Sequence, residues 1–157
     1  MRSANLLLIT IALALFGVAC GSRNMDAKPA PGFVELKDDP VYDFRAVAPE
    51  GVAVAARLVK LEEPQDVGFW ERAVALRMRE LEGYALVDTR DVKSLDGVAG
   101  RELIFGHDEQ GKPYVYRVRL FAHKTKLLVV EAGGAKEQMD RFAQSVDWML
   151  SQFKAPQ

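Results

Sequence analysis

The chain has few residues of the kinds that form disulfides and metal sites. It contains one cysteine, Cys20, and two histidines, His107 and His123. A single cysteine cannot form a disulfide within the chain, and an odd cysteine in an exported protein calls for another explanation. No His-Glu-x-x-His, Gly-x-Ser-x-Gly or Walker pattern occurs in the sequence. The sequence therefore predicts no metal, no cofactor and no catalytic residue, and we expect a protein that is not an enzyme.

The chain also has no marked excess of positive or negative charge. The chain has 21 Lys and Arg against 22 Asp and Glu, and its formal net charge is −1. Binding to nucleic acid depends on clustered Lys and Arg that neutralise phosphates. The composition therefore predicts no nucleic-acid partner.

Only one long apolar run is present, and it lies near the N-terminus. Residues 6–16 are almost entirely apolar, and Arg2 precedes them. The run is too short to cross a membrane comfortably and has the length of the apolar region of a signal peptide. Small residues then lead into Cys20.

This N-terminal pattern resembles a bacterial lipobox, which explains the single cysteine. The resemblance implies that Cys20 is diacylated, for example with palmitate, and becomes the new N-terminus after cleavage. A membrane would then be a partner through the N-terminal lipid. Gly21 stands where Asp would favour the inner membrane, so the resemblance implies the periplasmic side of the outer membrane. The alternative is an ordinary secreted protein that is cut near Ala19.

The sequence predicts three segments. Residues 1–19 are the expected lipoprotein signal peptide, and residues 20–32 are the acylated cysteine with a flexible tether rich in small, polar, Pro and Gly residues. Residues 33–157 are the expected folded domain.

Alternating apolar residues and turn signals predict about six strands in the domain. Asp96-Gly97 is a hairpin signal, and Pro49-Glu50-Gly51 is a turn. The predicted strands are residues 42–47, 52–61, 84–95, 98–107, 114–122 and 127–132.

Two amphipathic stretches predict the main helices. One follows Pro64 and ends at Gly83, and the other spans residues 135–153. On the second helix we expect Phe142 and Val146 to be buried. The order β-β-α-β-β-β-β-α, with short hairpins between strands, predicts an α+β fold with a largely antiparallel sheet.

The ordered motifs in this domain resemble the PsbP-like superfold. The residues that carry the resemblance are Phe44, Ala48 to Val52, Gly83-Tyr84, Leu95 to Gly100, and Val129 to Ala132 before the last helix. This superfold is shared by a photosystem II extrinsic subunit, a Ran-binding nuclear import factor and many bacterial lipoproteins. The resemblance implies binding or scaffolding rather than catalysis.

Three apolar residues fall outside the apolar stripes of the two helices. Trp148 lies nearly opposite the stripe of the last helix, and Phe69 and Leu76 lie outside the stripe of the first. They are candidates for a surface that contacts a protein partner or a membrane interface. The alternative is that the tether or a loop covers them.

A possible anion contact consists of arginines on two predicted strands. Arg117 and Arg119 alternate along one strand and so share a face, and Arg101 on the neighbouring strand is a candidate third member. The alternative is a solvated sheet face on which these arginines pair with glutamates.

Three functional hypotheses follow from these patterns. The first is a lipid-anchored, non-enzymatic cell-envelope domain that binds or scaffolds an envelope protein. The second is a carrier for a small amphipathic ligand held between the sheet and a helix, which would need an apolar pocket. The third is a hydrolase whose site no motif reveals.

Overall fold

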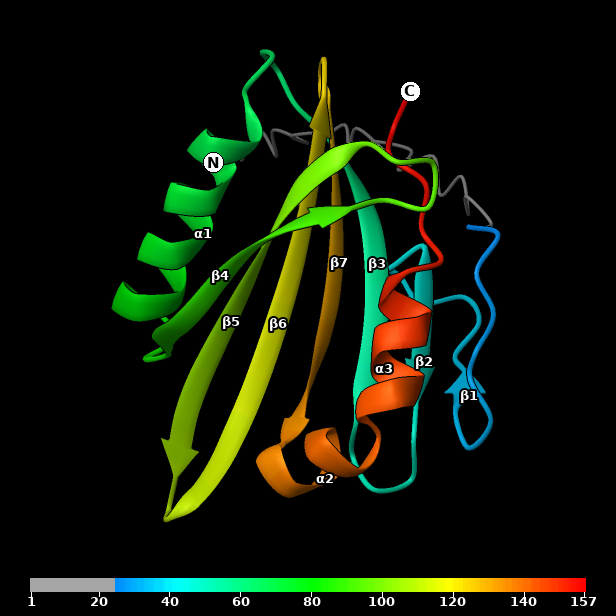
Figure 1. Ribbon diagram of the computed structural model, residues 1–157, viewed down its shortest axis with the longest axis vertical. Coiled ribbons are helices and arrows are strands. Elements are labelled where there is room, and N and C mark those ends of the chain that lie inside the picture. The colour runs from blue at the N-terminus through cyan, green and yellow to red at the C-terminus, as the bar shows by residue number, and fades with distance from the viewer. Residues whose placement is uncertain (1–24) are drawn as a thin grey trace, which may run out of the picture.

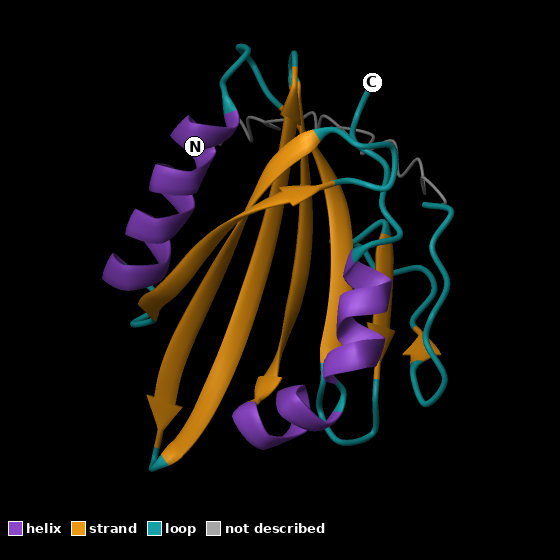
Figure 2. Ribbon diagram, in the orientation of Figure 1, coloured by secondary structure: helices purple, strands orange, loops and turns teal. Residues whose placement is uncertain are grey.

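The computed structural model describes residues 25–157, so Cys20 and the predicted signal peptide lie outside the described residues. Seven strands form one antiparallel sheet in the order β1-β2-β3-β7-β6-β5-β4 (Figures 1 and 2). The strands are β1 (Val34–Glu35), β2 (Phe44–Val47), β3 (Ala53–Lys60), β4 (Ala85–Lys93), β5 (Ala99–Glu109), β6 (Lys112–His123) and β7 (Lys126–Ala135). The helices are α1 (Val67–Glu80), α2 (Lys136–Arg141) and α3 (Ala143–Leu150).

The α+β class and the predicted element order are confirmed, with two differences in detail. The two-residue strand β1 pairs with β2 at one edge and brings the sheet to seven strands. The predicted last helix is divided at Phe142, which ends α2 and begins α3 with φ −95° and ψ 13°.

The central strand of the sheet, β7, is the last strand in chain order. After β3, α1 carries the chain to the far edge, where β4 begins (Figure 1). Three hairpins then return through β5 and β6 to β7, which pairs with β3 along eight residues from Ala53 to Lys60. β7 therefore lies between β3 and β6, and most of its side chains are buried.

Turn chemistry determines the hairpins. Gly97 has a positive φ of 84° between β4 and β5, and its N–H donates to the carbonyl of Ser94 at 2.9 Å. Gln110 and Gly111 both have positive φ between β5 and β6, the conformation of a two-residue hairpin turn. These strands extend to Glu109 and Lys112, beyond the predicted bounds at residues 107 and 114, so a two-residue turn connects them.

Each face of the sheet has its own core, because successive strand residues point to opposite sides. Leu127 and Val129 pack with the inner side of α1, whereas Leu128 and Val130 pack with α2 and α3. We call these the α1 face and the α3 face. Figure 1 shows the two helical layers on opposite sides of the sheet.

Helix α1 begins at Val67 because Asp66 caps it: the Asp66 carboxylate accepts a hydrogen bond from the Phe69 N–H at 2.7 Å. Its predicted end near Gly83 agrees with the left-handed φ of 70° at that glycine. None of the α1 side chains is fully buried. The helix therefore rests on the sheet through half-buried residues such as Trp70 and Val74.

The predicted apolar side of the last helix is largely confirmed, with one correction. Val146 and Met149 are completely buried. Phe142 is only half-buried, because it lies at the break between α2 and α3 and packs at the margin of the core. Its ring meets the ring of Phe33 edge-on, with centroids 5.5 Å apart.

Candidate functional site

A buried ion-pair network lies on the α3 face between β5 and β6. The register places Glu102 directly opposite Arg119. One oxygen of Glu102 accepts hydrogen bonds from Arg119 Nε at 2.9 Å and from Arg117 Nη2 at 2.8 Å. Glu102 is only 2% exposed. The structure therefore brings Arg117 and Arg119 together on one face, as the sequence predicts, around a glutamate.

The same network connects the sheet to a helix. Arg117 Nη1 donates to Asp147 Oδ1 of α3 at 2.7 Å. Arg117 thus uses all of its nitrogens on carboxylates of the protein, whereas Arg119 donates to Glu102 through Nε alone. An external anion at this place would contact Arg119 rather than Arg117. The anion contact stays a prediction.

Arg101 does not join this network, because it lies on the α1 face. In the pairing of β5 with β6, Arg101 lies opposite Leu120. The register would have to shift by one residue to place Arg101 opposite Arg119. Its guanidinium donates two hydrogen bonds of 2.9 Å to Glu71 of α1 and one of 2.5 Å to Asp91 of β4. These hydrogen bonds, first that of Glu71, raise the pKa of Arg101. Arg101 therefore fastens α1 to the sheet.

The three candidate partner-surface residues are exposed but do not form one surface. Trp148 is 48% exposed on α3, and Phe69 and Leu76 are 40% and 57% exposed on α1. Since α1 and α3 cover opposite faces of the sheet, one partner surface cannot include both Trp148 and the pair Phe69 and Leu76. Phe69 also packs edge-on against Trp70, with ring centroids 5.3 Å apart.

From Met25 onwards, the segment predicted as a flexible tether packs against the domain. Ala30 of this segment is 3% exposed and belongs to the core of the α3 face, together with Phe33 at the start of the predicted domain, which is 7% exposed. The backbone of Lys28 forms two hydrogen bonds with the Gln152 side chain, of 3.0 and 2.9 Å. Residues 25–32 are therefore part of the domain surface, and they leave Trp148 uncovered.

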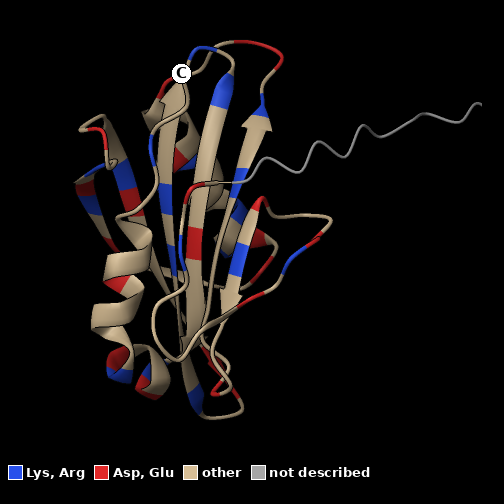
Figure 3. Cartoon of the chain, turned by 90° about the vertical axis from the view of Figure 1, so that its right-hand side faces the viewer, with Lys and Arg blue, Asp and Glu red and all other residues tan. Residues whose placement is uncertain are grey.

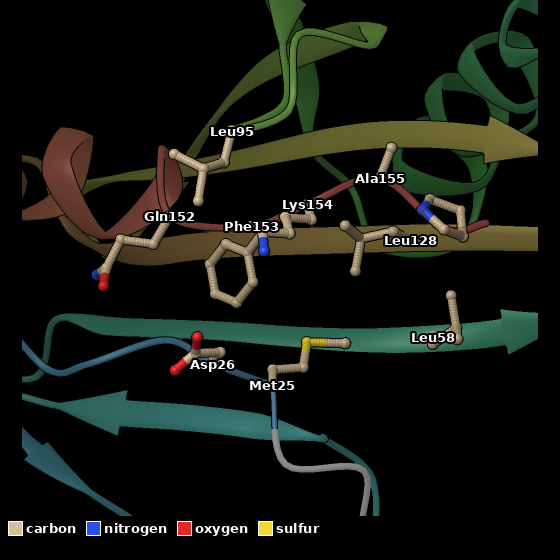
Figure 4. A pocket seen from close by; sticks show the side chains of 10 residues that line it. Met25, Asp26, Leu58, Leu95, Leu128, Gln152, Phe153, Lys154 and Ala155 are labelled. Atoms are coloured by element: carbon tan, nitrogen blue, oxygen red, sulfur yellow. The ribbon is translucent and has the colours of Figure 1, made fainter.

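A small cavity opens where the first described residues meet the C-terminal segment (Figure 4). Its volume is about 220 Å³. Met25 and Phe153 face each other across it, and Leu58 of β3 and Leu128 of β7 form its floor. The cavity therefore lies beside the point where the chain arrives from Cys20.

The histidines do not form a metal site with other residues that the structure describes. His107 Nδ1 lies 3.1 Å from the carbonyl oxygen of Gly83, and its ring stacks on Tyr84. Within residues 25–157, no group of three or more His, Cys, Asp or Glu side chains is placed to hold a metal ion. Among the helices of this part of the chain, none is long and apolar enough to cross a membrane.

Two buried glutamates are absent from the candidates that the sequence suggests. Glu102 follows Arg101 and precedes the apolar residues Leu103 to Phe105, and Glu131 interrupts the apolar strand β7. Both are less than 10% exposed. A lone charge in the apolar interior of a strand is the signal that could have identified Glu131, since buried charges need partners. Glu102 carries no such signal, because Arg101 stands beside it.

Comparison with known proteins shows likeness at the level of structure. No protein-family model and no curated protein sequence matches the chain. LpqN of Mycobacterium tuberculosis, which is involved in cell envelope biogenesis, superposes with a TM-score of 0.66 at 14% identity, over 84% of this chain and 83% of LpqN. Cyanobacterial PsbP (CyanoP) of Synechocystis superposes with a TM-score of 0.52 at 11% identity, over 80% of this chain and 83% of that protein.

These similarities extend over most of the described domain. They agree with the order of motifs from Phe44 to the last helix and with the antiparallel sheet between helices. The chain therefore has a PsbP-like fold.

Proposed function

We propose that this protein is a lipid-anchored cell-envelope protein, and that its domain binds an envelope protein through a surface centred on Trp148. The observation that carries this proposal is the exposure of Trp148, at 48%, on a helix whose other large apolar side chains are buried. Exposed tryptophans are frequent anchors of protein interfaces, because they bury a large apolar area at a small cost in side-chain entropy.

The surroundings of Trp148 suit such an interface. Gln144 and Arg141 are exposed on the preceding turns, and Asp147 is exposed while it pairs with Arg117. Polar groups of this kind form the rim around an aromatic anchor. Figure 3 shows acidic and basic residues interspersed on the side of the molecule that it views, so that specific contacts rather than a large field would select the partner.

The anchor would hold this surface close to the membrane. Cys20 precedes the first described residue, Met25, by five positions. At about 3.6 Å per residue the two Cα atoms are at most ~18 Å apart. A domain held so closely would meet partners in the same envelope layer. The involvement of LpqN in cell envelope biogenesis supports this role, and Gly21 after the cysteine favours the periplasmic side of the outer membrane.

The two rival functions have weaker support. Two cavities of about 220 and 180 Å³ lie against the core. Sites for drug-sized ligands have volumes of about 300 Å³ or more, so a carrier of a small amphipathic ligand of that size is less favoured than a partner-binding domain. A hydrolase would need a nucleophile beside a base in a cleft. The arginine–glutamate network is paired internally and offers neither group.

The test compares two exposed apolar residues on opposite faces. The native lipoprotein is purified from detergent-solubilised envelope as wild type, Trp148→Ala and Leu76→Ala. We expect one envelope protein to copurify with wild type and with Leu76→Ala, and Trp148→Ala to weaken the interaction by about 2 kcal/mol or more. The free energy of unfolding should change by less than about 0.5 kcal/mol in Trp148→Ala, since the residue is on the surface.

Two outcomes would contradict the partner surface. One is a partner that stays bound to Trp148→Ala with unchanged affinity. The other is the loss of the partner in Leu76→Ala alone, which would place the interface on α1.

A further inference from the structure

A second cavity lies on the opposite side of the sheet from Trp148, between α1 and strands β3, β6 and β7. We call it the α1 cavity. Its volume is about 180 Å³. Its walls are mainly apolar side chains: Val59, Val74, Val118, Leu127 and Val129, with Trp70 of α1. An apolar cavity of about 150 Å³ in another protein accommodates a molecule of benzene, so the α1 cavity has room for one six-membered ring.

The position of α1 explains why this space remains open. The helix packs on β4, β5 and β6, and its side chains are at most half-buried. Arg101 fixes this position through its hydrogen bonds to Glu71. The part of the α1 face formed by β3 and β7 therefore lies at the margin of the helix.

One end of the α1 cavity is polar, and its central group is Glu131. This residue is 8% exposed. Its Oε1 atom accepts a hydrogen bond from the hydroxyl of Tyr116 and lies 3.8 Å from Arg57 Nη2. Burial, and then the charge of Glu131, raise the pKa of Tyr116, so that its phenol stays protonated and donates. Glu131 Oε1 therefore already has two partners within the protein, Tyr116 and Arg57.

Three buried polar atoms of residues that line the cavity have no partner within the described chain. They are Glu131 Oε2, Arg57 Nε and Trp70 Nε1. The first is a hydrogen-bond acceptor and the other two are donors. Buried polar groups in native proteins are nearly always hydrogen-bonded, because leaving them unpaired costs free energy. Three such atoms around one cavity indicate a site that is completed by an occupant.

A hydroxyl group matches this set. It provides one O–H donor for Glu131 Oε2 and two lone pairs for the N–H groups of Arg57 and Trp70. The positive charge of Arg57 balances the negative charge of Glu131, and the third charged lining residue, Arg77, is paired with Glu82 at 3.4 Å, so the site favours a neutral molecule over an ion. The apolar walls favour a compact hydrocarbon body.

We infer that the α1 cavity binds a small neutral alcohol or phenol with a body about the size of one six-membered ring. Its hydroxyl lies against Glu131, Arg57 and Trp70, and its ring lies between α1 and β7. This site is separate from the Trp148 surface, because the two lie on opposite faces of the sheet. It does not depend on the proposed partner or on the lipid anchor.

The test follows the two tryptophans of the chain. The full chain, isotope-labelled only at tryptophan, is placed in lipid nanodiscs and titrated with phenol and, separately, with toluene. We expect phenol to shift the Trp70 indole N–H resonance saturably and toluene to bind at least about tenfold more weakly, since toluene lacks the hydroxyl. The Trp148 resonance on the other face is the internal control and should not move.

Three results would overturn the inference. The Trp70 resonance could show no saturable shift, which would mean that the cavity holds water alone. Toluene could bind as tightly as phenol, which would leave the polar end without a role. The Trp148 resonance could follow the same binding curve as Trp70, which would show non-specific uptake.

Matched variants test the polar end directly. Glu131→Gln should weaken phenol binding by about tenfold, because one carboxylate acceptor is lost. Glu102→Gln changes the other buried glutamate, on the α3 face, and should leave phenol binding unchanged. Val74→Phe should abolish phenol binding by filling the cavity. Equal weakening of phenol binding by Glu131→Gln and Glu102→Gln would overturn the assignment of Glu131 as the group that binds the hydroxyl. If Glu131→Gln does not fold, the comparison of phenol with toluene in the wild type tests that assignment instead.

Discussion

At the scale of single residues, the structure depends on charges placed inside a sheet with partners on neighbouring strands. Glu102 holds Arg117 and Arg119 through one carboxylate oxygen. Arg117 is 14% exposed, and its second acidic partner, Asp147, is 57% exposed. The two acidic partners of Arg117 therefore differ mainly in burial, which allows their contributions to be separated.

We predict that Glu102→Ala is much more destabilising than Asp147→Ala. Removal of Glu102 leaves two largely buried guanidinium groups without their shared carboxylate, and the usual cost is about 3–5 kcal/mol. Removal of Asp147 breaks a pair that solvent screens, at a cost of about 0–1 kcal/mol. Urea denaturation of both variants measures the difference in the free energy of unfolding. Equal losses would show that the network is open to solvent.

Single residues also show where prediction from sequence reaches its limit. The alternation of strand side chains correctly places Arg117 and Arg119 on one face. The face of Arg101 depends on the register between β5 and β6, and a shift of one residue moves a side chain to the opposite face. No local pattern fixes that register to one residue, so the grouping of Arg101 with the other two could not be tested before the structure.

At the scale of elements, hairpins are the most predictable part of this chain. Asp96-Gly97 predicts the turn between β4 and β5 because glycine readily adopts the positive φ that the turn requires. The division of the last helix is different: residues 136–150 contain no Pro or Gly that would mark a break at Phe142. Its apolar periodicity continues through the break, so the pattern predicts one helix.

Residues 25–32 differ from the expected flexible tether for a related reason. Their small, polar, Pro and Gly residues are typical of linkers. In the structure Ala30 and Phe33 pack into the core without regular secondary structure at Ala30. Irregular packing of this kind has no periodicity that a sequence could reveal, and the edge strand β1 has only two residues.

The C-terminal segment after α3 is held by the β4–β5 turn, and we expect this contact to depend on pH. The Asp96 carboxylate accepts hydrogen bonds from Ser94 Oγ at 2.6 Å and from the Ala155 N–H at 2.9 Å. These bonds, first that of Ser94, lower the pKa of Asp96 below its ordinary 3.8. The stabilisation is therefore complete above about pH 4 and is lost as the pH falls through the lowered pKa.

We predict that protection of the Ala155 amide from hydrogen exchange decreases as the pH falls through this range. In Asp96→Ala the protection should be low at every pH, because the acceptor is absent. In Asp96→Asn it should remain, weaker but without the acid-dependent loss, since the amide oxygen still accepts and does not titrate. Protection factors measured by NMR give the comparison. The same acid-dependent loss in Asp96→Asn would show that another group controls the contact.

At the scale of the whole molecule, the two faces of the twisted sheet carry three regions, two of them on the α3 face. The Trp148 surface lies on the α3 face, the α1 cavity lies on the other face, and Met25 lies beside the C-terminal segment at the cavity of Figure 4. The sequence predicts the fold class and the order of elements, and it names Trp148 as a candidate surface residue while leaving open whether the tether covers it. It does not predict the α1 cavity, because that cavity is assembled from β3, β6, β7 and α1, which are distant in the chain.

The proposed lipid anchor holds the domain on a membrane through Cys20. Its most direct test is the mass of the N-terminal tryptic peptide of the mature protein isolated from bacterial membranes. We predict a peptide of residues 20–23, ending at Arg23, that carries acyl chains on Cys20. The Cys20→Ala chain should lack this peptide and leave the membrane fraction or remain unprocessed. An unacylated mature N-terminus in wild type, with membrane association unchanged by Cys20→Ala, would contradict the account.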